Sequence, residues 1–133
     1  MWMKLLACTA ALLAGCTTTP TPNAETSAGR LLATEFGLPS PNAGRLVVKR
    51  DTGFMGMGCG HRIYLNGSAV AELRAGEAVT LHVRPGDHTI GVVATGICDG
   101  NAETSLSIQA NQSKTFRSGA DQSGSLRIQP TAF

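Results

Sequence analysis

Two cysteines and a histidine are the side chains best suited to chemistry in this sequence. Cys59 and His61 lie in one glycine-rich segment, and Cys98 follows in a second one. Thiolates and imidazoles together bind zinc or copper, whereas two cysteines in an oxidising compartment form a disulfide. The spacing leaves both interpretations open, because zinc frameworks use paired motifs such as CxxC and each cysteine here stands alone.

The amino terminus indicates the compartment. A positive start at residues 1–4 is followed by an apolar run at residues 5–13 and by Leu13-Ala14-Gly15-Cys16, whose small residues suit a cleavage site. A permanent spanning helix needs roughly 20 apolar residues, more than this run offers. The chain therefore carries an export signal.

This start resembles the lipobox family of bacterial lipoprotein signals. The resemblance implies that residues 1–15 are removed and that Cys16 becomes the first residue, carrying acyl chains such as palmitate. Thr17 stands where an inner-membrane retention signal usually has Asp. We therefore expect an envelope protein anchored by lipid in the outer membrane and facing the periplasm.

Export favours a disulfide between Cys59 and Cys98, since both would then lie in an oxidising compartment. Closing a loop of about 39 residues contributes roughly 4 kcal/mol in the chain-entropy account. The alternative is a metal site formed by Cys59, His61 and Cys98. We expect no cofactor, because periplasmic thiols tend to oxidise.

No arrangement of residues predicts catalysis. A nucleophile needs an oriented base beside it, and a Cys59 in a disulfide cannot serve. His82 falls on the polar side of an alternating segment, and His88 follows a Pro-Gly turn. The acidic residues occupy ordinary turn or strand-surface positions, so we expect no enzyme.

The glycine-rich segment 51–61 is a further candidate. A phosphate-binding loop needs a strand before it and a helix after it, and here a strand follows. Phe54, Met55 and Met57 could form an exposed apolar patch that contacts a partner. The alternative is that they cap the end of the folded domain.

Composition excludes one class of partner. The whole chain has a formal net charge of +2, and Lys4 lies in the signal, so the mature chain is almost balanced. Nucleic-acid binding lacks its electrostatic basis. Lys49 and Arg50, followed at once by Asp51, are interpreted as a solvated strand end.

Composition along the chain predicts three parts. Residues 1–15 are the signal, residues 16–43 a lipidated terminus and tether with prolines that favour extended backbone, and residues 44–133 a β-domain. The spacing of Leu31, Leu32 and Phe36 also allows a short helix within the tether.

From Gly44 onward, short alternating segments separated by turn residues predict about seven strands. Val79, Leu81 and Val83 share one side of the segment 77–83. Residues 102–108 alternate in the same way, and Asn66-Gly67 predicts a two-residue hairpin turn. Segments of this kind predict an all-β sandwich or barrel.

The segments Ile63–Leu73 and Val83–His88, with the hairpin at Asn66-Gly67, carry a resemblance. They are similar to the small β-sandwich domains of the PEGA and DUF2846 type in bacterial envelope lipoproteins. The resemblance implies an immunoglobulin-like or transthyretin-like sandwich and no catalytic residues. We therefore expect a non-enzymatic structural or interaction module that contacts an envelope protein or cell-wall glycan, the alternative being a metal-binding or redox lipoprotein using Cys59, His61 and Cys98.

Overall fold

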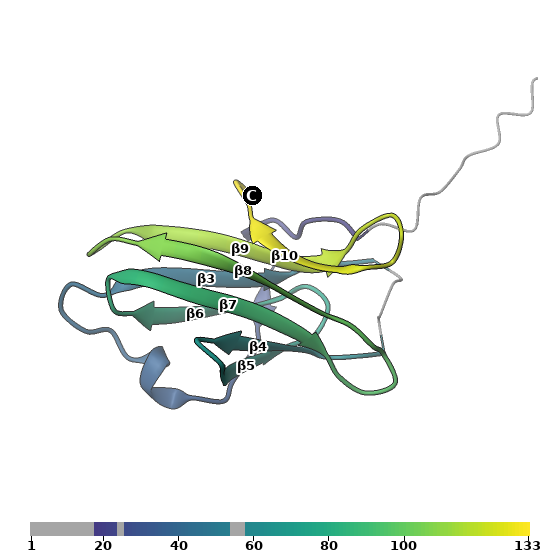
Figure 1. The fold of residues 1–133 in the computed structure, drawn as a ribbon, viewed down its shortest axis with the longest axis horizontal. Helices are drawn as coiled ribbons and strands as arrows, with labels where there is room; N and C mark the ends of the chain where they lie inside the picture. Colours follow the sequence, from purple (N-terminus) through teal and green to yellow (C-terminus); the bar gives the residue numbers. More distant parts are fainter. Residues whose placement is uncertain (1–17, 24–25, 54–57) are drawn as a thin grey trace, which may run out of the picture.

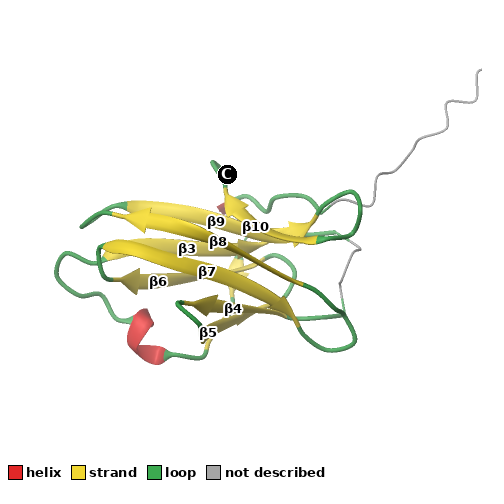
Figure 2. Cartoon of the chain, viewed as in Figure 1, coloured by secondary structure: helices red, strands yellow, loops and turns green. Residues whose placement is uncertain are grey.

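Two β-sheets packed face to face make up the protein (Figure 1). The computed structural model describes residues 18–23, 26–53 and 58–133. Each sheet has five strands, in the order β1-β6-β3-β9-β10 for the first and β2-β5-β4-β7-β8 for the second. The predicted all-β sandwich is confirmed, and Figure 2 shows how little helix accompanies it. The elements are β1 (Ser27–Ala28), β2 (Arg30–Leu31), the 3-10 helix η2 (Thr34–Gly37), β3 (Gly44–Arg50), β4 (His61–Leu65), β5 (Ser68–Leu73), β6 (Glu77–Val83), β7 (Gly86–Ala94), β8 (Asn101–Ile108), β9 (Ser113–Ala120) and β10 (Leu126–Pro130).

Alternation along the strands forms the core, as predicted. In β6, Val79, Leu81 and Val83 are buried while Thr80 and His82 between them remain partly exposed. Side chains point to opposite faces with a period of two, so each strand contributes every second residue. The core residues from β3 to β10 are Leu46, Val48, Ile63, Leu65, Val70, Ala71, Leu73, Val79, Leu81, Val83, Ile90, Val92, Leu106, Ile108, Phe116 and Ile128.

The hairpin between β4 and β5 turns at the predicted residues. Asn66 has φ 50° and Gly67 has φ 84°. Both lie in the left-handed region that a type I′ turn requires. The Asn66 side chain also accepts a hydrogen bond from the backbone N–H of Thr89 (2.9 Å). The turn is therefore held by β7 as well as by its own backbone.

The segment before β3 differs from the predicted tether. Its described residues, 18–23 and 26–43, pack on the sandwich: β1 pairs with β6 in the first sheet and β2 with β5 in the second. The chain crosses from the first sheet to the second at Gly29, where an added Cβ would lie 2.2 Å from Leu73 Cδ2. Glycine fits this crossing because it has no side chain. Short strands and η2 replace the short helix.

The sandwich has two distinct ends. One end, here called the disulfide end, gathers the β3–β4, β5–β6, β7–β8 and β9–β10 connections and lies on the right in Figure 1. The other, the hairpin end, carries the β4–β5, β6–β7 and β8–β9 turns. No helix among the described residues is long and apolar enough to cross a membrane.

Candidate functional site

A disulfide joins Cys59 to Cys98 at the disulfide end, as predicted, with 6.0 Å between the Cα atoms. Cys59 precedes β4, and Cys98 lies in the connection from β7 to β8. The two loops are therefore fastened next to neighbouring strands, whose first and last residues, His61 and Ala94, are paired. The bond stabilises by restricting the unfolded chain.

The residues of the alternative metal site have other partners. The two sulfur atoms are bonded to each other, and Nδ1 of His61 lies 2.9 Å from Oγ of Ser118. Within residues 18–23, 26–53 and 58–133, no three His, Cys, Asp or Glu side chains are grouped so as to hold a metal ion. Cys59, His61 and Cys98 are therefore engaged in a disulfide and a hydrogen bond, and the described residues offer no grouped set of metal ligands.

Lys49 and Arg50 are buried, and their interpretation as a solvated strand end is wrong. Their exposed fractions are 1% and 2%. Arg50 donates hydrogen bonds to the carbonyl oxygens of Leu73 (3.1 Å) and Cys59. Lys49 donates to the carbonyl oxygens of Thr21 (2.9 Å) and Phe133. Burial lowers the pKa of both side chains, and carbonyl acceptors offset part of the cost of burying them.

Asp51, the residue directly after Arg50, carries a buried carboxylate. Oδ2 of Asp51 accepts hydrogen bonds from Oγ1 of Thr18 (2.8 Å) and from Nη2 of Arg117 (2.6 Å). The Asp51 side chain is 1% exposed and that of Arg117 22%. The other oxygen, Oδ1, has no hydrogen-bond partner among the described residues. Gly119 lies so close that an added Cβ would be 2.2 Å from Oδ2.

His61 and Ser118 form a second buried polar pair beside this carboxylate. Burial and, to a smaller extent, the charge of Arg50 lower the pKa of His61 to about 3. The imidazole is therefore neutral at physiological pH. Ser118 is fully buried as well, so both members of this hydrogen-bonded pair are shielded from solvent.

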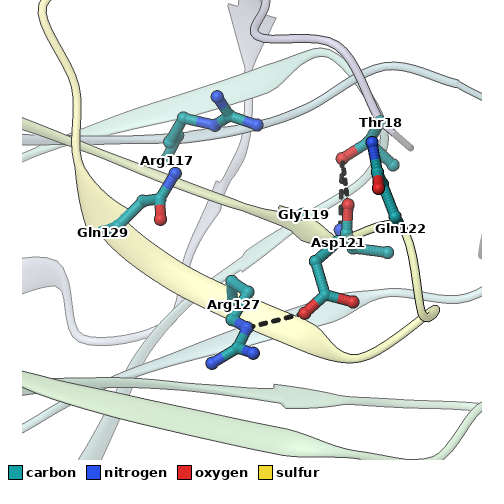
Figure 3. Close-up of a pocket in the computed structure, with 8 residues that line it drawn as sticks. Thr18, Arg117, Gly119, Asp121, Gln122, Arg127 and Gln129 are labelled. Carbon is teal, nitrogen blue, oxygen red and sulfur yellow. Dashed lines mark hydrogen bonds and ion pairs between the residues drawn. The ribbon is translucent and has the colours of Figure 1, made fainter.

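Two hollows adjoin at this end and share Thr18, Gly119 and Ala120 in their walls. The smaller one, of about 240 Å³, lies between the sheets beside the disulfide and is lined in addition by Arg50, Asp51 and His61. The larger one, of about 410 Å³, opens over β9 and β10 (Figure 3). The walls of both hollows mix polar and apolar groups.

Two of the three charged side chains that line the larger hollow, Asp121 and Arg127, are paired with each other, and the third, Arg117, is paired with Asp51. Nε of Arg127 donates to Oδ2 of Asp121 at 2.9 Å, and Figure 3 shows this pair facing the hollow. The Ser123 hydroxyl and then Arg127 lower the pKa of Asp121 to about 2. Gln122 and Gln129 complete the rim. The arrangement offers hydrogen-bond donors and acceptors around the hollow.

Several residues of the buried polar cluster were not identified from the sequence. Arg50 follows Leu46 and Val48 at the spacing of one strand face, a signal that predicts burial, whereas nothing local links Thr18 or Arg117 to Asp51. Cys16 and the predicted contact residues Phe54, Met55 and Met57 lie outside the described residues. Gly53 and Gly58, which flank the latter, belong to the connection at the disulfide end.

Comparisons with known proteins identify no relatives. No protein-family model matches the chain, and no curated protein matches its sequence. The similarity to PEGA-type domains therefore stays a prediction.

Proposed function

We propose that this chain is a non-enzymatic, lipid-anchored protein of the bacterial envelope whose sandwich serves as a structural or interaction module. Cys16 attaches it to the outer membrane, and the domain in the periplasm contacts an envelope protein or cell-wall glycan. The export-signal pattern supports the lipid anchor. The arrangement of the two sheets supports the role as an interaction module.

The outer face of the second sheet is the observation that carries this proposal. It presents a largely polar surface formed by alternate residues of β4, β7 and β8, with Thr89 opposite Ser105 and Gly91 opposite Glu103, and Val93 adds one exposed apolar side chain. Thr89, Ser105 and Glu103 are exposed. The outer face of the first sheet, by contrast, is partly covered, because Lys49 there is buried under the backbone of Thr21 and Phe133.

The chemistry of this open face suits a polar partner. Tyr64 pairs with Gly91, so its ring has no side chain opposite it in β7. An aromatic ring beside hydroxyl and carboxylate groups can stack on a sugar ring or a peptide plane while its neighbours form hydrogen bonds. Arg62 beside it is paired with Glu72 at 3.0 Å, and the hydroxyl-rich part of the face carries two acidic side chains, Glu103 and Asp87.

Photocrosslinking in intact cells tests this function. A photoreactive residue replaces Glu103 on the open face, and the matched control replaces Arg45, an exposed residue of β3 on the other sheet. The expected result is a discrete crosslinked product, protein or glycan, from position 103 and much less from position 45. Equal products at both positions, or none at position 103, would refute the open face as the interaction surface.

A further inference from the structure

The first described residues are fastened to the disulfide end. Thr18 is 9% exposed. Its hydroxyl donates to Oδ2 of Asp51 (2.8 Å) and accepts from the backbone N–H of Ala120 (3.1 Å). Thr19 then exchanges two backbone hydrogen bonds with Thr52, at 2.9 and 3.0 Å. Segment 18–21 therefore belongs to the folded body, and little free chain remains between it and Cys16.

We propose that the sandwich stands end-on at the membrane, with its disulfide end against the phospholipid headgroups. This inference rests on the proposed lipidation of Cys16. Two residues of extended chain span about 7 Å, and acyl chains inserted in the bilayer hold the residue that carries them at the headgroup level. Thr18 therefore lies within about 7 Å of the headgroups, and the loops around it face the lipid.

The hairpin end points away from the membrane. β7 has nine residues and runs from the hairpin end to the disulfide end. At about 3.3 Å per residue it covers roughly 30 Å. The open face of the second sheet then lies perpendicular to the membrane plane, where a partner in the periplasm can reach it.

The chemistry of the disulfide end fits a zwitterionic headgroup layer. Two of its basic side chains are paired with acidic ones, Arg117 with Asp51 and Arg127 with Asp121. Arg74 and Asp99 are also exposed at this end and carry opposite charges, so the described part of this end has no cluster of free cations that selects a polyanion. Ile97, beside Cys98, is 100% exposed and adds an apolar side chain to this end. An apolar side chain is more favourably placed in the membrane interface than in water.

Tryptophan quenching tests the orientation, because the only tryptophan, Trp2, lies in the signal and the mature chain has none. Mature lipidated protein, which lacks residues 1–15, is placed in phosphatidylethanolamine–phosphatidylcholine vesicles that contain a headgroup-attached quencher. The probe variants are Ile97→Trp and, as a second reporter, Gln122→Trp at the disulfide end. The matched control is Gln109→Trp, exposed at the hairpin end. We expect at least twofold stronger quenching of both probes than of the control.

A spacer variant distinguishes the effect of the tether length on the quenching from the effect of the lipid anchor. Ten Gly and Ser residues inserted between Thr17 and Thr18 should preserve vesicle binding and remove most of the quenching difference. Equal quenching at both ends in lipidated, vesicle-bound protein would overturn the end-on arrangement while leaving the anchor intact. Intact mass without acyl chains, together with failure to sediment with vesicles, would overturn the proposed anchor and this inference with it.

Discussion

His61 is expected to make the domain sensitive to mild acid. In the folded protein its pKa is about 3, chiefly because the imidazole is buried, and in the unfolded chain it returns to about 6.5. Below pH 6.5 the unfolded chain therefore binds a proton at this site that the folded chain does not. The free energy of unfolding falls as the pH decreases, and this loss ends only near pH 3.

The size of the effect follows from the two pKa values. Each pH unit within the window removes about 1.4 kcal/mol, so lowering the pH from 6.5 to 5 costs about 2 kcal/mol. Glu72 and Asp121 do not disturb this interval. Their pKa values are lowered in the folded state, so their contributions to stability are present above about pH 5 and are lost only at lower pH.

Urea unfolding followed by circular dichroism at pH 7, 6 and 5 measures the effect, with the disulfide kept intact. His61→Asn removes the titrating group while keeping an amide near Ser118, and it should lose about 2 kcal/mol less than the wild type between pH 7 and 5. Ser118→Ala is the matched control, since it removes the hydrogen-bond partner and keeps the imidazole. Equal acid losses in the wild type and His61→Asn would refute the reasoning.

Three further substitutions test the disulfide end. Replacing both disulfide cysteines by serine should lower the free energy of unfolding in urea by about 4 kcal/mol; a loss under about 1 kcal/mol would contradict the loop-closure account. Gly119→Ala should cost about 1–3 kcal/mol by thermal unfolding, because its Cβ would overlap the Asp51 carboxylate. Gly91→Ala, whose Cβ would meet nothing nearer than 3.5 Å, is its control and should be nearly neutral. Arg117→Gln should lower the free energy of unfolding by about 3 kcal/mol, because it leaves the buried Asp51 carboxylate without its ion pair. The double mutant with Asp51→Asn should regain most of that loss, and a double-mutant cycle measures the coupling between the two side chains.

Local patterns predicted the parts of the fold that depend on neighbouring residues. Alternation over 77–83 assigned its buried face correctly, because strand geometry fixes the side of every residue. Asn66-Gly67 identified the hairpin because few residue pairs tolerate two positive φ angles. The disulfide was predicted from the expected export signal and from the number of cysteines that would remain after its removal.

The buried polar cluster depends instead on distant contacts. Lys49 resembles any charged residue at a strand end, and it is buried only because Thr21 and Phe133, which are 28 and 84 positions away, place carbonyl oxygens over it. Thr18 likewise meets Ala120 across 102 positions. No periodicity within a strand reports contacts of this range, so residues 18–23 were interpreted as a spacer.

The attachment of Thr18 also determines how the protein responds to mechanical force. Its bonds to Asp51 and Ala120 lie at corresponding ends of β3 and β9, two neighbouring strands that run parallel. A pull through the amino terminus is thus transmitted by Thr18 to both strands, and a pull directed along the strand axes acts across the direction of the inter-strand hydrogen bonds. Under such shear the hydrogen bonds of a ladder must yield together rather than one after another, so the β3–β9 ladder would resist tension applied through Thr18 as a unit.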